Sequence, residues 1–142
     1  REGLDAIQRE LGSDPDRVSV FACDLSNAQD TQKTAEKLSS SFKEVYGLIN
    51  NAGVYPFGGL QTTDSQAWDA CLATNLSAAF LLAKALSPEM ARAGKGRIIN
   101  VSSTAGLLPN HFALAYSVSK AGLIQLTKTL AKELGPQVIT VN

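Results

Sequence analysis

A tyrosine and a lysine four residues apart, Tyr116 and Lys120, are the side chains of this sequence best suited to proton transfer. On a helix, residues at this spacing lie on the same face one turn apart, so the ammonium group would stand near the phenol. A nearby cation favours the phenolate form, and such a phenol can act as a general acid or base. The alternative is a surface lysine beside a half-buried tyrosine, and the pair alone does not decide between the two.

Alternating strands and helices would position this pair. Short runs that are apolar on both faces predict strands at 18–22, 45–49, 97–101 and 138–141. The intervening stretches predict helices, two of them opened by the capping boxes Ser26-x-x-Gln29 and Thr63-x-x-Gln66. A further helix is predicted over 3–11 and one from Tyr116 to Leu134. This alternation predicts an α/β fold, a doubly wound parallel sheet with helices on both faces.

Unusual polar residues follow the predicted strands. Asp24 comes after the first strand, Asn50-Asn51-Ala52-Gly53 after the second, and Ser102 and Ser103 after the third. The Tyr-Lys pair opens the next helix. Because ligands of parallel sheets bind at the carboxyl ends of the strands, we expect these residues to meet at one edge and form a site.

Composition excludes several classes of function. The 142 residues have the length of one domain, and 13 basic residues balance 13 acidic ones, so nothing indicates a nucleic-acid or membrane-surface partner. No apolar run approaches the roughly 20 residues of a membrane span. Cys23 and Cys71 lack metal-ligand spacing, and the single His111 excludes a multi-histidine metal site. We therefore expect a cytoplasmic protein with buried, reduced thiols.

In order and spacing, these residues resemble the short-chain dehydrogenase/reductase family. The resemblance rests on Asn51-Ala52-Gly53 after a strand, on a serine thirteen residues before a tyrosine, and on Tyr-x-x-x-Lys. Thr74-Asn75-Leu76 and Cys23-Asp24-Leu25 match further motifs of the family. The resemblance covers essentially the whole chain and is nearest to 3-oxoacyl-carrier-protein reductase-like members.

The resemblance implies a Rossmann-type fold and an NAD(P)-dependent oxidoreductase that interconverts a carbonyl and a secondary alcohol. Its catalytic residues would be Asn75, Ser103, Tyr116 and Lys120. Tyr116 would be the general acid or base, and Lys120 would also bind the nicotinamide ribose. Ser103 would bind the substrate oxygen and stabilise a developing oxyanion. Asn75 would hold a water of a proton relay; alternatively, it is a helix-interior asparagine bonded to a carbonyl.

The same resemblance implies a site for NAD or NADP. Asp24 would accept from the adenine amino group, or simply precede a capped helix. Asn51 would line the ribose, or the Asn-Ala-Gly sequence would be a plain turn. The implied cofactor-binding residues are Asp24, Leu25, Asn51, Ala52, Gly53, Tyr116 and Lys120. A small carbonyl or alcohol substrate would lie against the apolar segments 55–61 and 105–111, and a homo-oligomer, dimer or tetramer, is implied.

One family motif is absent. Nothing in the 142 residues matches the phosphate-binding Gly-x-x-x-Gly-x-Gly turn. We therefore expect residues 1–142 to be one partial domain, lacking the first two strands and a C-terminal part. In the strand order 3-2-1-4-5-6, the segment 18–22 would then lie apart from the sheet, and the fragment alone would be unstable and inactive. A non-catalytic binding or scaffold protein and a nucleoside-sugar epimerase remain the alternatives.

Overall fold

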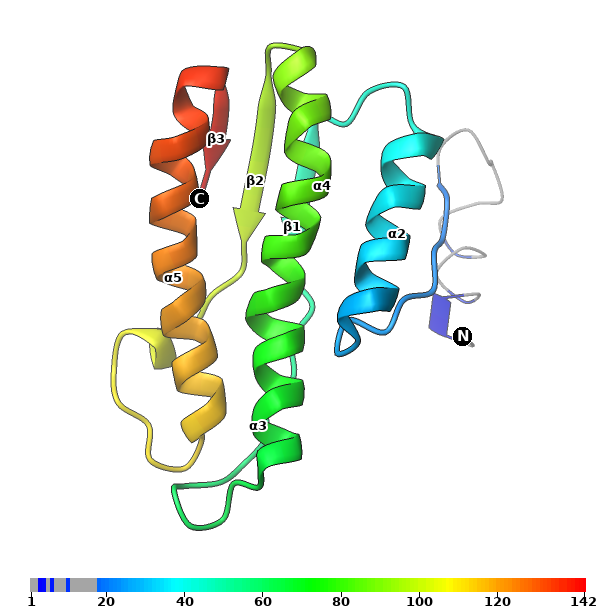
Figure 1. Cartoon of the computed structure of the whole chain (residues 1–142). Coiled ribbons are helices and arrows are strands. Elements are labelled where there is room, and N and C mark those ends of the chain that lie inside the picture. Colours follow the sequence, from blue (N-terminus) through cyan, green and yellow to red (C-terminus); the bar gives the residue numbers. More distant parts are fainter. Residues whose placement is uncertain (1–2, 5, 7–9, 11–17) are drawn as a thin grey trace.

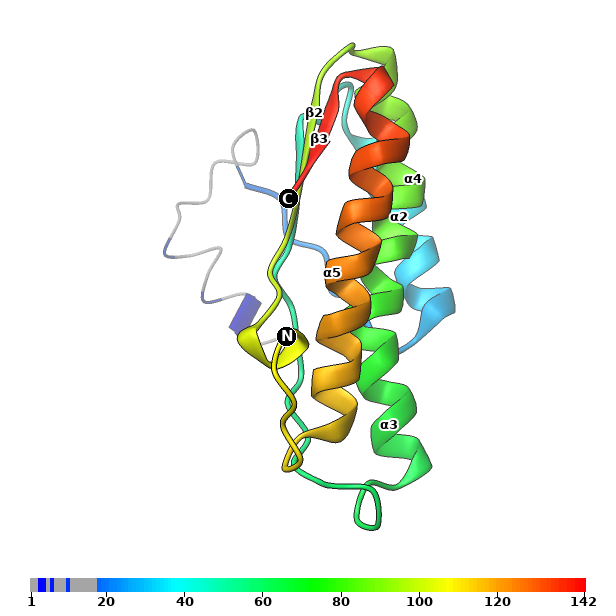
Figure 2. The same cartoon turned by 90° about the vertical axis from the view of Figure 1, so that its left-hand side faces the viewer.

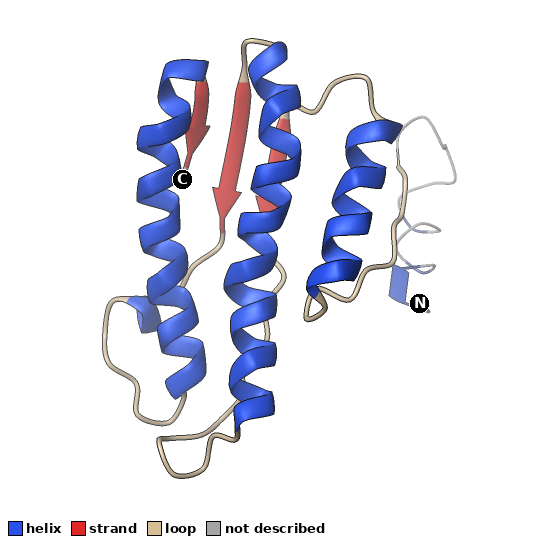
Figure 3. Ribbon diagram, in the orientation of Figure 1, coloured by secondary structure: helices blue, strands red, loops and turns tan. Residues whose placement is uncertain are grey.

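The computed structural model describes residues 3, 4, 6, 10 and 18–142, which form a parallel three-stranded sheet with helices packed on it (Figures 1 and 3). The strands are β1 (Gly47–Asn50), β2 (Gly96–Asn100) and β3 (Ile139–Val141). The helices are α2 (Ala28–Ser41), α3 (Ser65–Leu72), α4 (Ala78–Arg92) and α5 (Leu114–Leu134). Shorter helical turns are η1 (Ala73–Ser77), η2 (Thr104–Gly106) and η3 (Gly135–Gln137).

The sheet has the order β1-β2-β3, with both pairs of neighbours parallel. In register, Gly47 pairs with Arg97 and Gly96 pairs with Ile139. Because parallel neighbours need a crossover connection, α3 and α4 join β1 to β2, and α5 joins β2 to β3. Three of the four predicted strands are therefore confirmed, with ends shifted by one or two residues. The predicted parallel α/β architecture is confirmed as well.

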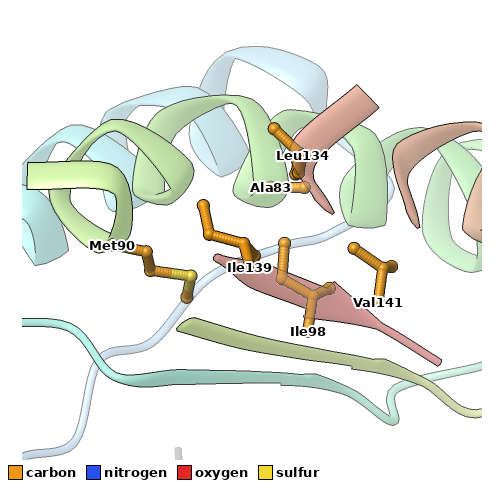
Figure 4. Close-up of a cluster of buried hydrophobic side chains, with 6 residues drawn as sticks. All are labelled: Ala83, Met90, Ile98, Leu134, Ile139 and Val141. Atoms are coloured by element: carbon orange, nitrogen blue, oxygen red, sulfur yellow. The ribbon is translucent and has the colours of Figure 1, made fainter. Parts of the chain in front are cut away.

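The long helices all lie on one face of the sheet, as Figure 2 shows with the sheet seen on edge. On that face, side chains of α4, α5 and the strands form the main hydrophobic core (Figure 4): Ala83, Met90, Ile98, Leu134, Ile139 and Val141. Alternate strand residues point the other way, and Ile49 and Ile99 are 65% and 43% exposed. Helices on both faces were predicted; in the part of the chain that the structure describes, α2 to α5 cover only one.

The predicted strand at 18–22 is wrong. These residues form no strand and pair with none of the described strands. They lie instead against α2 and its end, where the Phe21 ring meets the Phe42 ring at 6.3 Å and Lys37 Nζ lies 5.1 Å from the Phe21 centroid. Of the predicted helix over 3–11, the described residues 3, 4, 6 and 10 are helical. Its other residues, Gly12 and the turn at 14–16 lie outside the described residues.

Both predicted capping residues are displaced by one position. The N-cap of α2 is Asn27, not Ser26, and its Oδ1 accepts from the amides of Gln29 and Asp30. The N-cap of α3 is Asp64, not Thr63, and its Oδ1 accepts from Ala67 N at 2.7 Å. A carboxylate or amide oxygen competes well with a hydroxyl for this role, so the neighbouring Asx residue takes the cap.

The helix from Ser65 to Arg92 is a single rod interrupted by one π-helical turn, η1. The expectation that no apolar run approaches a membrane span is wrong, because this 28-residue helix is long and apolar enough to cross one by length and composition. It packs against α2 on one side and α5 on the other, and its inner face covers all three strands. That is the setting of the core helix of a globular fold.

The turn η2 rests directly on the backbone of α5 at Gly106. A Cβ at this position would lie 2.7 Å from the Lys120 carbonyl carbon and 2.8 Å from Ala121 N. We expect Gly106→Ala to push η2 away from α5 and lower the free energy of unfolding by about 1–3 kcal/mol, measured by urea denaturation. Gly135→Ala is the control, because nothing lies within 4 Å of a Cβ there; equal stability losses in both variants would contradict the prediction.

Candidate active site

Asn75 lies in the π-helical turn η1 and is 2% exposed. Its Nδ2 donates to Val54 O at 2.9 Å and to Ser119 Oγ at 3.0 Å, and its Oδ1 accepts from Val54 N at 2.8 Å. The amide therefore holds both backbone groups of Val54, just beyond the end of β1, and a side chain of α5. Single π turns inside α-helices are frequent at functional sites. Here the turn places a buried amide between the loop after β1 and α5.

Lys120 and Tyr116 lie on one face of α5, as the sequence predicts. Lys120 is 4% exposed; its Nζ donates to Val101 O at 2.7 Å and lies 5.7 Å from the centroid of the Tyr116 ring. A Cβ on Gly53 would lie 3.7 Å from Lys120 Nζ and 3.4 Å from Asn75 Oδ1. The structure thus brings Gly53, Asn75, Tyr116 and Lys120 together beyond the ends of β1 and β2.

The two serines after β2 have different partners. Ser102 Oγ donates to Lys120 O at 3.0 Å and so ties the strand end to α5. Ser103 Oγ accepts from Ala105 N at 3.2 Å, and Ser103 is the N-cap of η2. Both serines are half-buried. Ser102 donates its hydroxyl proton to Lys120 O, whereas Ser103 only accepts, so the hydroxyl proton of Ser103 is left for a ligand.

A chain of polar side chains crosses the sheet just before the site. Asn50 Nδ2 donates to Asn100 Oδ1, and Asn100 Nδ2 donates to Thr127 Oγ1, both at 2.8 Å. The Asn50 side chain therefore has a structural role, since it links β1 to β2. The next two residues, Asn51 and Ala52, are exposed, and they line a cavity of about 70 Å³ together with Leu25 and with Thr74 and Asn75 of η1. This cavity brings together the predicted cofactor residues Leu25, Asn51 and Ala52, with Asn75 beside them.

Asp24 stands at the turn that leads into α2. Its Oδ1 accepts from Ser26 Oγ at 2.7 Å and from Ser26 N at 2.9 Å, and its own amide donates to Asp30 Oδ2. The Ser26 hydroxyl, and then its amide, hold the pKa of the Asp24 carboxyl below its ordinary value of 3.8. The carboxylate is fully exposed, so both predicted roles, helix entry and adenine contact, stay compatible with its position.

We expect the pH dependence of Asp24 to report these two bonds. Because its pKa is lower in the folded chain than in the unfolded one, its contribution to stability is present above pH 3.8 and is lost as pH falls through the folded value. Carboxyl NMR titration should give a midpoint below 3.8, and Ser26→Ala should raise it. A midpoint that Ser26→Ala leaves unchanged would show that the hydroxyl is not the cause.

Ser119 and Cys71 belong to the same buried cluster. The predicted burial of Cys71 is confirmed, but its place beside Asn75 and the role of Ser119 were not predicted from sequence. Ser119 Oγ donates to Tyr116 O at 2.7 Å while it accepts from Asn75. Cys71 is buried, with its Sγ 3.4 Å from Asn75 Nδ2, and burial raises the pKa of its thiol. Cys23, expected to be buried, is only half-buried. Sequence spacing could have indicated the Ser119 bond, because a serine in a helix often donates to the carbonyl three or four residues before it, and Tyr116 lies three residues before Ser119.

The structure is that of a parallel α/β protein in which buried Asn75, buried Lys120 and half-buried Tyr116 lie near one another at the ends of the strands. A family profile described as short chain dehydrogenase matches residues 1–142. The chain belongs to this family, which confirms the resemblance drawn from the motifs.

Two curated relatives cover nearly all of the chain. The chain is 36% identical over 141 residues to a D-threitol dehydrogenase of Mycolicibacterium smegmatis, covering 99% of this chain and 54% of that protein. It is 32% identical over 142 residues to a 3-oxoacyl-[acyl-carrier-protein] reductase of Thermotoga maritima, covering 100% of this chain and 58% of that one. The chain therefore spans little more than half the length of these relatives.

Solved structures agree with the fold. A metagenomic short-chain oxidoreductase in complex with NADP superposes with a TM-score of 0.89 at 38% identity, over 97% of this chain and 62% of that one. An NAD+-bound xylitol dehydrogenase superposes with a TM-score of 0.78 at 33% identity, over 86% of this chain and 47% of that one. Both the Rossmann-type fold and the family are therefore shared with structures that hold a nicotinamide cofactor.

Proposed function

We propose that this chain carries the acid–base centre and part of the cofactor site of an NAD(P)-dependent oxidoreductase that interconverts a carbonyl and a secondary alcohol. One observation carries the proposal: Asn75 and Lys120, which are far apart in sequence, meet at Gly53 beyond the ends of β1 and β2, and the Tyr116 ring lies 5.7 Å from Lys120 Nζ. The oxidoreductase names of the relatives and the nicotinamide cofactors in the similar structures support it.

The residues present fit parts of a nicotinamide dinucleotide. Ala52 and Gly53 are exposed and small, so a flat ligand can approach the backbone at the end of β1. Asn51, Ala52 and Leu25 border a cavity at that edge, and Asp24 adds an acceptor at the start of α2. When bound, the nicotinamide would supply the hydride. No residue run in the 142 matches the glycine-rich turn that binds a pyrophosphate.

The chain's own residues would position the substrate and move the proton. Tyr116 would give its phenolic proton to a carbonyl oxygen, or accept one from an alcohol. Ser103 would donate a hydrogen bond to the same oxygen, since its hydroxyl proton is not used in accepting from Ala105 N. Lys120 would reach the ribose with the ammonium protons that it does not give to Val101 O. Asn75 would keep the loop at Gly53 in place and support a proton-relay water.

A nicotinamide turnover assay tests this proposal. The chain, and separately a longer protein that contains it, would be incubated with ketones and secondary alcohols and either nicotinamide cofactor. Because the glycine-rich turn is absent, we propose that residues 1–142 alone bind the cofactor weakly and turn over slowly or not at all, while the longer protein is active. No turnover by the longer protein on any substrate would instead favour the non-catalytic, binding or scaffold alternative.

We also propose a substrate, a domain organisation, a cellular location and an assembly for this activity. A small carbonyl or alcohol is the proposed partner, in a single dinucleotide-binding and catalytic domain of which residues 1–142 form a part. The cytoplasm is the proposed location and a homo-oligomer the proposed assembly. Size-exclusion chromatography with light scattering on the longer protein would test for a dimer or tetramer, and a monomer at micromolar concentration would contradict the proposed assembly.

A further inference from the structure

The wall beside Tyr116 is built from two loops that are bonded to each other. One follows β1 and the other precedes α5. Gly58 N donates to Phe112 O at 2.9 Å, and Leu114 N donates to Gly58 O at 3.0 Å, which forms a parallel bridge between Gly58 and Ala113. The backbone of Gly59 also lies against the second loop, because a Cβ on Gly59 would be 3.1 Å from His111 O. The two loops therefore act as one surface, the aromatic wall (residues 54–60 and 107–112).

Tyr55 joins this aromatic wall to the proposed acid–base residue. Its ring centroid is 4.5 Å from that of Tyr116, with the two ring planes tilted by 57°. The Phe57 ring packs edge-on against Tyr55 with the centroids 5.0 Å apart, and Asn110 Nδ2 donates to the Tyr55 hydroxyl at 3.3 Å. Partners from both loops thus fix the ring, which is still 43% exposed. A fixed and exposed aromatic ring beside a reacting group is a contact surface for ligand.

The rest of the aromatic wall is mostly apolar, with Asn110 and His111 as its polar side chains. Its large side chains project into solvent: Phe57, Leu60, Leu107, Leu108 and Phe112 are 65% to 80% exposed. Neither 54–60 nor 107–112 contains an Asp, Glu, Lys or Arg. His111 is the one titratable imidazole there, and its ring lies against Phe112 at 3.8 Å. Contiguous exposed apolar groups of this kind mark binding sites.

Charged or many-hydroxyl substrates fit this wall poorly. A phosphate or carboxylate is normally held by Arg or Lys. The nearby cation, Lys120, is buried and donates to Val101 O. A polyol would bring hydroxyls against side chains that offer few partners, and unpaired polar groups are penalised on binding. An aryl or branched alkyl group would instead cover Tyr55 and its neighbours.

We propose that the substrate carbonyl carries an uncharged aryl or branched alkyl substituent, and that Tyr55 is the residue that selects it. This inference rests on the proposed function, and it separates the chain from its D-threitol dehydrogenase relative, which is named for a polyol. Tyr55 contacts the substituent, while Tyr116 serves the oxygen.

Paired kinetics in a longer, active protein that contains this chain test the selection. Acetophenone should be reduced with a kcat/KM about 100-fold above that of 1,3-dihydroxyacetone. Tyr55→Ala should lower kcat/KM for acetophenone, mainly through KM, about tenfold more than it lowers kcat/KM for dihydroxyacetone. Tyr55→Phe keeps the ring and should stay near the wild type. Tyr46→Ala, an exposed tyrosine before β1, is the matched control.

Two results would overturn the inference: a preference for dihydroxyacetone, or an equal loss for both ketones in Tyr55→Ala. A binding measurement keeps the test independent of turnover. In NMR titrations, acetophenone should shift the ring signals of Tyr55, and dihydroxyacetone at equal concentration should not. Absence of turnover with these shifts present would reject the proposed function and retain the selective surface; absence of the shifts would reject the surface itself.

Discussion

Tyr116→Phe is expected to abolish turnover in a longer, active protein that contains this chain while cofactor affinity is retained. The substitution removes one hydroxyl and keeps the ring that packs against Tyr55. Proton transfer by a positioned side chain contributes about 10²- to 10⁴-fold to rate, and a loss of that size in kcat is predicted. Stopped-flow or steady-state oxidation of the nicotinamide would measure it, with fluorescence titration of the cofactor alongside.

A matched tyrosine makes the Tyr116 experiment decisive. Tyr46 lies just before β1 at the opposite end of the strand, and its ring packs against Arg97 at 5.8 Å. Tyr46→Phe should keep kcat within about twofold, as expected for a surface change remote from the reacting atoms. If Tyr116→Phe kept a tenth or more of the wild-type rate, the general acid would have to be another group.

Asn75→Leu is expected to lower the free energy of unfolding by about 3 kcal/mol, because it leaves buried backbone groups without partners. Leucine keeps the branched shape of asparagine, but it can neither donate to Val54 O and Ser119 Oγ nor accept from Val54 N. Urea denaturation measures the loss. Hydrogen exchange at the Val54 amide should speed up more than exchange in β2.

Gln125→Leu is the control for Asn75→Leu, since it makes a similar change at an exposed position of α5. A change within about 0.5 kcal/mol is expected there. An Asn75→Leu variant as stable as the control would mean that water satisfies Val54 equally well. The Asn75 amide would then not be what holds the loop after β1 against α5.

The elements of this fold that were predictable are those in which local pattern and tertiary packing agree. The apolar spacing of α4 and α5 places Ala83, Met90 and Leu134 over the strands, and the apolar runs give β1 to β3. The candidate site residues Asn75, Tyr116 and Lys120 could be proposed from sequence because motif spacing does not depend on the details of packing. Their contacts with Gly53 and Val54 were not predictable, because they join segments separated by more than 20 residues.

Hydrophobic periodicity could not have avoided two errors, the strand predicted at 18–22 and the missed π turn η1, because both depend on contacts between distant residues. The apolar run at 18–22 has the composition of a strand, but a strand also needs a neighbour, and Phe21 packs on Phe42 instead. The π turn η1 has no sequence signal, because it is stabilised by what Asn75 meets across the fold. The one-residue errors at Asn27 and Asp64 arose from preferring a capping box to the adjacent Asx side chain.

The wholly parallel sheet also governs how quickly the chain can fold. Asn50 bonds Asn100 across β1 and β2, a separation of 50 residues, so no strand pair can form before a long loop has closed. Loop closure on this scale slows folding relative to helical bundles, toward the millisecond-to-second range. Helices α4 and α5 can form earlier, since their hydrogen bonds are local. The hydrogen bonds that join Asn50, Asn100 and Thr127 would then be among the last contacts to form, after the helices.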